Sequence, residues 1–325
     1  MHLSIIIPVG DDPDGLAQTL DSLLPEVRSQ YDIEVIVAND GGHAGVEKIC
    51  RDREVKCLSI RPNRGSYNAR NEGADVALGE VLGFIDAGIT VCPGWCAMAR
   101  QAAVSADYIA GDIRHGPLEH DGAVAIYQDL FSFKIERLFS EAKFGPTANV
   151  VVRKDVFVKA GKFDGRLRSS GDLEFGSRLA SAGSYRQCFD VERYVVHPYR
   201  SLEGILKKQM RLVMGTRHLA RLHPERFSSR LIGRGARFKL LLPPAHFWLL
   251  CPGRSGRGIG PSEVARLREA SLTTRVGVYL VAYAVKLATW VGYASPLKNP
   301  DAFEWKVEPA LSSEAPASAP AGIRS

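Results

Sequence analysis

Three aspartates in the first 90 residues follow apolar runs that are typical of buried strands. Parallel strands end at the same edge of a sheet, and ligands of such sheets bind at that edge. We therefore expect the three carboxylates to line one site, each in a loop that begins where its strand ends. The runs and the aspartates that follow them are 3–8 with Asp11, 33–38 with Asp40, and 81–85 with Asp86.

The segment that precedes Asp86 has the residues of an anion-binding turn. Gly65 permits a tight turn, and the pattern predicts a helix over 68–78 that opens with Arg70 and Asn71. Backbone N–H groups at a helix start, an arginine and a nearby carboxylate suit a nucleotide diphosphate, with or without a bridging divalent cation. An ordinary strand–helix unit with a solvated arginine would show the same pattern.

Two more carboxylates, Asp172 and Glu174, lie in the segment 171–175. Group transfer to a hydroxyl needs a base that accepts the hydroxyl proton, and a carboxylate can do this. Glu174 would lie on the same side as Asp172 if the segment is extended, with Arg178 as its charge partner. Asp172 also precedes an amphipathic run, so a helix N-cap is the structural alternative.

An alternation of strands and helices must position these residues. The predicted strands are 3–8, 33–38, 56–60, 81–85, 109–113, 149–153 and 186–191, and the predicted helical stretches are 14–30, 44–53, 68–78 and the basic segment 200–230. Such alternation implies βαβ units and a mostly parallel sheet. The expected fold class is α/β, a Rossmann-like mixed sheet flanked by helices, with a further helical region toward the C-terminus.

Composition and charge exclude several classes of protein. Hydrophobic residues form 45% and charged residues 24% of the chain, which indicates a folded protein rather than a disordered or fibrous one. Residues 1–197 carry 22 basic and 28 acidic side chains, whereas residues 198–300 carry 18 and 4. A basic C-terminal third indicates an anionic partner. Nucleic acid is not expected because no nucleic-acid-binding motif accompanies the charge, and the apolar character of the same third favours a membrane surface.

Two apolar stretches in the C-terminal third are candidates for membrane contact. Residues 276–294 carry a single charge, Lys286, and are just long enough to cross a bilayer. Residues 238–251 are interrupted by Pro243 and Pro244 and fit an interfacial or re-entrant helix pair. We expect monotopic contact with the membrane, and a true span or ordinary core or dimer packing are the alternatives.

The predicted organisation follows from these stretches. The parts are an α/β domain over 1–220, a basic and apolar helical region, membrane-associated, over 221–304, and a disordered tail over 305–325. The six cysteines form no CxxC pair, which indicates a reducing compartment. The expected location is the cytoplasmic side of the membrane, peripheral or with one span, and otherwise the cytoplasm.

Four segments resemble, in order and spacing, the motifs of the family 2 inverting glycosyltransferases. They are SIIIPVGDD, IEVIVANDGG, RGSYNARNEGADVALGEVLGFIDAG and SSGDLEFGSRLASAG. The resemblance implies the GT-A fold for residues 1–220. It also implies transfer of a sugar from a nucleotide-sugar, UDP-linked, to a glycan or lipid-linked acceptor, with inversion at the anomeric carbon, in polysaccharide or glycoconjugate biosynthesis.

The resemblance assigns roles to individual residues. Asp172 matches the catalytic base that deprotonates the acceptor hydroxyl, and Glu174 would lie on the acceptor side. Arg211 in the basic helix is a further candidate, because guanidinium pairs with phosphate in a bidentate way and would neutralise the leaving diphosphate. The residues implied in nucleotide-sugar binding are Pro8 and Val9 at the nucleobase, Asp40 at the uracil or ribose, Arg70 and Asn71 at the nucleotide, and Asp86 at the diphosphate.

The sequence departs from the family at its DxD metal motif. The family usually has Asp-Ala-Asp, whereas this chain has Asp86-Ala87-Gly88. Asp86, helped by His197, would hold Mn²⁺ or Mg²⁺ with few protein ligands, since such ions take much of their shell from phosphates and water. The alternative is that basic side chains supply the positive charge at the leaving diphosphate.

Two other functions are compatible with parts of the pattern. The substitution of the second metal-motif aspartate by Gly88 would fit a non-catalytic relative that binds a nucleotide-sugar as an interaction subunit. A dinucleotide-dependent oxidoreductase would also have βαβ units, but it needs GxGxxG after the first strand. This chain has PVGDD there, at residues 8–12, which disfavours the oxidoreductase.

Overall fold

The computed structural model describes residues 1–30, 32–116, 122–246, 249–250 and 261–297. An eight-stranded mixed sheet has the strand order β3-β2-β1-β4-β7-β6-β8-β5. Its strands are β1 (Leu3–Val9), β2 (Ile33–Asp40), β3 (Lys56–Ile60), β4 (Val81–Ile85), β5 (Thr90–Val91), β6 (Tyr108–His115), β7 (Asn149–Arg153) and β8 (Gln187–His197).

Strands β1 to β4 are parallel, so their carboxyl ends reach the same edge. Leu3 of β1 pairs with Ile33 of β2 and with Val81 of β4. β7 runs antiparallel to β4 and β6, β8 runs parallel to β6, and β5 runs antiparallel to β8. β1 and β4 are buried along their whole length, as continuous apolar runs in the middle of a sheet should be. The predicted mixed α/β sheet is therefore confirmed.

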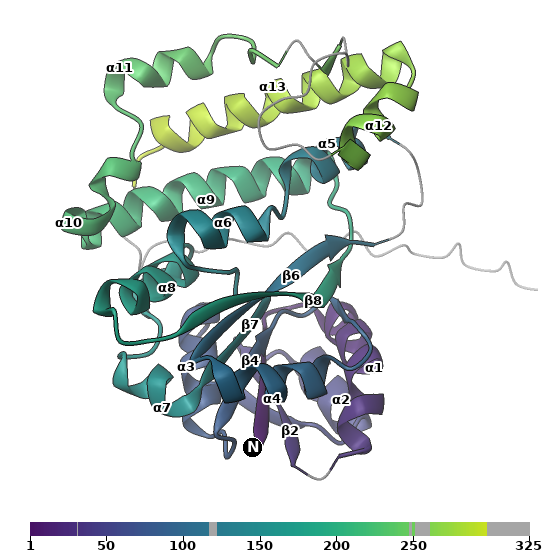
Figure 1. The fold of residues 1–325 in the computed structure, drawn as a ribbon, viewed down its shortest axis with the longest axis vertical. Helices are drawn as coiled ribbons and strands as arrows, with labels where there is room; N and C mark the ends of the chain where they lie inside the picture. The colour runs from purple at the N-terminus through teal and green to yellow at the C-terminus, as the bar shows by residue number, and fades with distance from the viewer. Residues whose placement is uncertain (31, 117–121, 247–248, 251–260, 298–325) are drawn as a thin grey trace, which may run out of the picture.

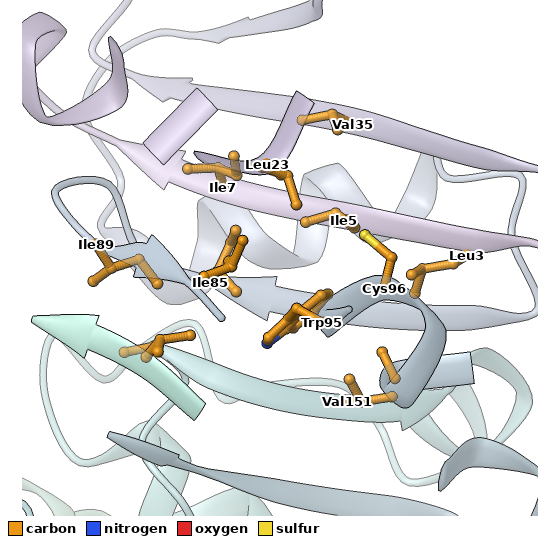
Figure 2. Close-up of a cluster of buried hydrophobic side chains, with 14 of the residues drawn as sticks. Leu3, Ile5, Ile7, Leu23, Val35, Ile85, Ile89, Trp95, Cys96 and Val151 are labelled. Carbon is orange, nitrogen blue, oxygen red and sulfur yellow. The ribbon is translucent and has the colours of Figure 1, made fainter. Parts of the chain in front are cut away.

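Three helices cover one face of the sheet: α1 (Pro13–Arg28), α2 (Ala44–Asp52) and α4 (Trp95–Ser105). The leucines of α1 recur at helical spacing and are buried in the core that these helices form with the sheet. Figure 2 shows part of this core, in which the labelled side chains are Leu3, Ile5, Ile7, Leu23, Val35, Ile85, Ile89, Trp95, Cys96 and Val151.

The opposite face packs against α3 (Ser66–Asp75), α6 (Ile135–Ala142), α7 (Lys154–Lys159) and α8 (Gly171–Ala182). Aromatic rings join these helices to the sheet. The centroid of the Phe163 ring lies 5.2 Å from Phe84, 5.1 Å from Phe157 and 5.0 Å from Phe175. Since Phe175 belongs to α8 and Phe84 to β4, this packing ties the helix that carries the predicted base to the centre of the sheet.

The remaining helices form a layer beyond the ends of β6 and β8 (Figure 1). Gln209 of α9 donates a hydrogen bond to Thr289 of α13 (2.9 Å), and Arg217 of α9 donates to the carbonyl oxygen of Gly292 (2.6 Å). The two long helices therefore lie side by side. The elements of this layer are α5 (Ala123–Phe131), α9 (Leu202–Leu222), α10 (Pro224–Phe227), η1 (Ser228–Arg230), α11 (Arg234–Arg237), η2 (Phe238–Leu240), α12 (Pro261–Glu269) and α13 (Leu272–Ala294).

The C-terminal predictions have mixed outcomes. The apolar stretch 276–294 is helical, and α13 is the one helix of the described residues that is long and apolar enough to cross a membrane. The helix pair predicted for 238–251 is wrong for the described part 238–246, where the short turn η2 is followed by a non-helical path. Pro243 and Pro244 explain this, because proline cannot donate the N–H that a helix requires. The predicted tail, 305–325, lies outside the described residues.

Candidate active site

Asp40 closes the turn between β3 and α3. One carboxylate oxygen accepts a hydrogen bond from the N–H of Arg64 and the other from the N–H of Gly65, both at 2.7 Å. Gly65 has φ +92°, a left-handed conformation that favours glycine. The buried Asp40 therefore fixes the loop at the carboxyl edge of the sheet, next to the place where the nucleotide is predicted to bind.

Arg70 and Asp86 form an ion pair at this edge. The Arg70 side chain is only 4% exposed, whereas the Asp86 side chain is 43% exposed, so the arginine holds the carboxylate at the mouth of the site. The Nε atom of Arg70 is buried and has no hydrogen-bond partner among the described residues. Because α3 begins at Ser66 rather than at residue 68, the free N–H groups of the helix start belong to residues 66–68 and not to Arg70.

Asp172 lies in the first turn of α8 and faces this ion pair. Its backbone N–H donates to the hydroxyl of Tyr67 (3.2 Å), and the Arg70 guanidinium lies 5.5 Å from the centre of the Tyr67 ring. Burial raises the pKa of the Asp172 carboxyl, and the charge of Asp86 adds to this rise. The N–H of Leu173 and the charge of Arg70 act in the opposite direction. A partly desolvated carboxyl with a raised pKa has the property of a general base.

His197, the last residue of β8, holds a basic side chain in place. Its Nδ1 lies 2.6 Å from the carbonyl oxygen of Pro198, and its Nε2 lies 2.7 Å from the guanidinium of Arg200. Since a carbonyl only accepts and a guanidinium only donates, Nδ1 carries the proton and Nε2 accepts from Arg200. Burial and the charge of Arg200 lower the pKa of His197 to about 4, so the ring is neutral at neutral pH.

Arg200, Lys208 and Arg211 form a group that we call the basic wall. Burial, followed by the charges of Arg200 and Arg211, lowers the pKa of Lys208 to about 8. Burial and the charge of Arg211 also lower the pKa of Arg200. The charge of Asp86 opposes the lowering of the pKa in both Lys208 and Arg200, so these two cations lie close enough to Asp86 to interact with its charge. Within the described ranges, no carboxylate forms an ion pair with any of these three cations.

Several of the predicted residues serve the scaffold in this structure. The side-chain amide of Asn71 donates to the carbonyl oxygen of Phe163 (2.9 Å) and accepts from its N–H (3.1 Å), so it ties α3 to a neighbouring loop. Pro8 and Val9 are buried at the end of β1, beside Ala38 and Asn39 of β2. Their predicted contacts with a nucleotide stay predictions.

The expectation that Glu174 shares a side with Asp172 is wrong. The segment 171–175 is helical, and residues two apart in a helix point in different directions. The Glu174 side chain is 2% exposed and pairs with Arg178 (2.8 Å) and with Arg226 (3.0 Å). Arg178 is thus confirmed as its charge partner, and Glu174 links α8 to α10.

The residues present do not fit the metal site that the resemblance implied. Among the described residues, no three acidic, histidine or cysteine side chains come together as a ligand set. The Asp86 carboxylate is paired with Arg70, Gly88 has no side chain, and the Nε2 lone pair of His197 faces Arg200. The alternative of basic side chains at the diphosphate agrees better with this arrangement.

Two groups near the site were not singled out from the sequence. Arg200 and Lys208 belong to the basic wall, and only their nearness to His197 and to Arg211 along the chain could have indicated them.

His115 is the second group. It pairs in register with His197 across β6 and β8, and its Nδ1 lies 3.3 Å from the carboxylate of Asp129. Its Nε2 is buried without a hydrogen-bond partner among the described residues.

Comparison with known proteins identifies the family. Residues 4–170 match the profile of Glycosyl transferase family 2. The glycosyltransferase AglE of Haloferax volcanii is 26% identical over 220 residues, which are 66% of this chain and 72% of that protein. The pre-mycofactocin glycosyltransferase of Mycobacterium tuberculosis is 24% identical over 249 residues, 72% of this chain and 51% of that protein.

A solved structure shares the fold. The mannosyltransferase PcManGT from Pyrobaculum calidifontis, in complex with GDP-Man and Mn²⁺, superimposes with a TM-score of 0.54 at 16% identity. The match covers 89% of this chain and 86% of that chain. The architecture is therefore of the GT-A type, as predicted.

The matched family, the sheet and the site define the class of protein. An α/β domain of the GT-A type carries carboxylates and an arginine at the carboxyl edge of its parallel strands. The chain belongs to glycosyl transferase family 2 and is a glycosyltransferase. Asp172 and the basic wall lie beyond the matched residues 4–170, so their roles depend on the geometry described above.

Proposed function

We propose that this enzyme transfers a sugar from a nucleotide-sugar, UDP-linked, to a glycan or lipid-linked acceptor, with inversion, in polysaccharide or glycoconjugate biosynthesis. The observation that carries this proposal is the position of Asp172. Its carboxyl has a raised pKa and faces the ion pair of Arg70 and Asp86 at the carboxyl edge of the sheet. A base and a diphosphate-binding group thus lie on the same site.

The proposed step is a single displacement. Asp172 accepts the proton of the acceptor hydroxyl while the oxygen of that hydroxyl attacks the anomeric carbon. The bond between the anomeric carbon and the diphosphate breaks, and its electron pair leaves with the nucleoside diphosphate. Attack and departure occur on opposite sides of the anomeric carbon, so one displacement inverts its configuration.

The nucleotide-binding roles are part of the proposal. Asp40 holds the loop at residues 64–65 by accepting hydrogen bonds from two backbone N–H groups, and it would contact the uracil or ribose beside the start of α3. Pro8 and Val9 lie at the end of the neighbouring strand β1 and would border the base. Arg70 and Asp86 would lie at the diphosphate, with Arg211 on the opposite side.

A membrane surface is the proposed place of action. The exposed apolar side chains Leu272, Val276 and Leu280 follow at four-residue spacing along α13, so they share one face of that helix. Phe238 and Leu242 are 68% and 61% exposed. Exposed apolar side chains within a basic region suit the cytoplasmic surface of an anionic membrane. Because α13 packs on α9 and α5, lying on the membrane agrees better with the structure than crossing it.

Donor turnover tests the proposed reaction. The purified protein is incubated with UDP- and GDP-linked sugars and with soluble or lipid-linked acceptors, and the released nucleoside diphosphate is measured. We expect Asp172→Asn to lower kcat by at least about 100-fold, because an amide cannot accept the proton. Asp155→Asn, a matched change on the exposed surface of α7, should retain wild-type turnover.

The remaining questions are whether the anomeric configuration inverts, whether Asp172 is the base and whether the protein is catalytic. Nuclear magnetic resonance of the product reports whether the anomeric configuration is opposite to that of the donor. Turnover that survives Asp172→Asn would remove Asp172 as the base. Nucleotide-sugar binding without turnover, with every donor and acceptor, would favour the non-catalytic relative.

A further inference from the structure

The charges around Asp86 do not balance. Arg70 neutralises this carboxylate, and Arg200 and Lys208 of the basic wall also interact with its charge. The described residues provide no carboxylate that pairs with Arg200, Lys208 or Arg211. Four cations, Arg70 and those of the basic wall, therefore accompany two acidic side chains, Asp86 and Asp172, at the edge where the nucleotide-sugar is proposed to bind. Such an excess is typical of a site that is completed by an anion.

Two of these cations, Arg200 and Lys208, are held in position by the protein. The Arg200 guanidinium donates to Nε2 of His197, while the backbone N–H of Arg200 donates to Oε1 of Gln128 (3.0 Å). The Nζ of Lys208 lies 4.4 Å from the centre of the Phe133 ring. Cations held in this way lose little conformational freedom when an anion binds.

Of the four buried arginine Nε atoms that have no hydrogen-bond partner among the described residues, two belong to this site. The Nε atoms of Arg70 and Arg200 are both buried without a hydrogen-bond acceptor in the described part of the chain. A buried donor that is left unpaired costs free energy, so an acceptor supplied by a ligand would relieve this cost. Phosphate oxygens are the acceptors that match guanidinium groups best.

We propose that the basic wall takes the role that a divalent cation has at a DxD motif, so that the leaving diphosphate is stabilised by Arg200, Lys208 and Arg211 without a metal ion. This inference rests on the proposed function. When the bond to the anomeric carbon breaks, the diphosphate gains one negative charge. Fixed cations stabilise that developing charge without reorganisation. Gly88, which replaces the second carboxylate of the motif, removes a negative charge that would otherwise oppose this arrangement.

Binding of inorganic pyrophosphate tests the site independently of the base, the sugar and the acceptor. Isothermal titration calorimetry of the full chain in excess EDTA should show binding. Lys208→Met and Arg211→Gln should each weaken it about tenfold, since each removes one charge-assisted contact. Lys207→Met is the matched control, because Lys207 is exposed, pairs with Glu203 and carries the same charge. We expect this control to bind pyrophosphate as the wild type does.

The outcomes separate this inference from the proposed function. The metal-free site would be overturned if pyrophosphate binding required added Mn²⁺. It would also be overturned if Lys207→Met weakened pyrophosphate binding as much as Lys208→Met does. Donor turnover that EDTA abolishes and Mn²⁺ restores would also overturn it, while leaving the transferase reaction intact. Metal-free pyrophosphate binding with the expected variant pattern, but without turnover of any donor, would support the anion site and contradict the proposed reaction.

Discussion

The Asp172 carboxyl is subject to opposing influences on its pKa. Burial raises the pKa, and so does the nearby charge of Asp86, while the N–H of Leu173 and the charge of Arg70 lower it. The net direction is upward from the ordinary value of 3.8. A raised pKa makes the carboxylate a stronger base, but a higher pH is then needed to ionise it.

The pH dependence of turnover should reflect this balance. We expect kcat/KM to fall as the pH decreases through the raised pKa of Asp172, because the protonated carboxyl cannot accept a proton. The acid limb should therefore lie above 3.8. His197 adds no step near its ordinary value of 6.5, since its pKa is lowered to about 4. A pH–rate profile of nucleoside diphosphate release measures both points, and an acid limb at or below 3.8 would contradict the first.

At the scale of elements, Glu174 connects α8 to α10. Its buried carboxylate accepts hydrogen bonds from Arg178 on its own helix and from Arg226 on α10. The connection holds α8, and with it Asp172, against the helical layer. Both arginines are 27% exposed, so water screens them in part.

Glu174→Gln should destabilise the protein by about 2 kcal/mol, since an uncharged amide leaves Arg178 without its counter-charge and Arg226 with only the exposed Glu225. The free energy of unfolding in urea measures this loss. Glu141→Gln removes an exposed pair with Arg137 and should cost less than about 0.5 kcal/mol. Equal losses in the two variants would show that the buried carboxylate is not a link between the helices.

At the scale of the whole molecule, the helical layer lies at one end and the sheet at the other (Figure 1). α13 is held in this layer through Lys286, whose Nζ donates to the carbonyl oxygen of Leu242 (2.8 Å). The charge in the middle of the apolar helix therefore has a partner within the protein. This pairing agrees with a helix that lies on a membrane rather than one surrounded by lipid.

Vesicle sedimentation tests the membrane proposal. The protein should sediment with vesicles that contain phosphatidylglycerol and bind more weakly to pure phosphatidylcholine, because basic side chains attract anionic lipid. Leu280→Gln combined with Leu242→Gln should release most of it, since both side chains are exposed and apolar. Leu78→Gln, a matched change at a side chain that is 75% exposed on the sheet domain, should leave sedimentation unchanged. Wild-type protein that stays in solution with both lipids would contradict the proposal.

Local patterns in the sequence were sufficient for much of the fold. β3, β4 and β7 have the predicted bounds, because apolar runs between turn residues depend on neighbours along the chain. The same patterns placed Asp40 and Asp86 at one edge of the sheet, where Asp40 is the last residue of β2 and Asp86 follows β4. The helix boundaries were less accurate, as the earlier start of α3 shows. The prediction at 238–251 treated the two prolines as a break between two helices, whereas only the short turn η2 forms before them.

The sequence by itself determined the family, the order of the strands and helices, and the candidate base Asp172. Tertiary structure alone decided which side chains face the site. Glu174 turns toward Arg226, 52 residues away. The guanidinium of Arg200 is held by His197 and interacts with the charge of Asp86, which is distant in the chain. Ion pairing and burial depend on distances in space, and so does the raised pKa of Asp172. Residue types and their spacing do not give these distances, because the folded sheet is what brings distant segments together.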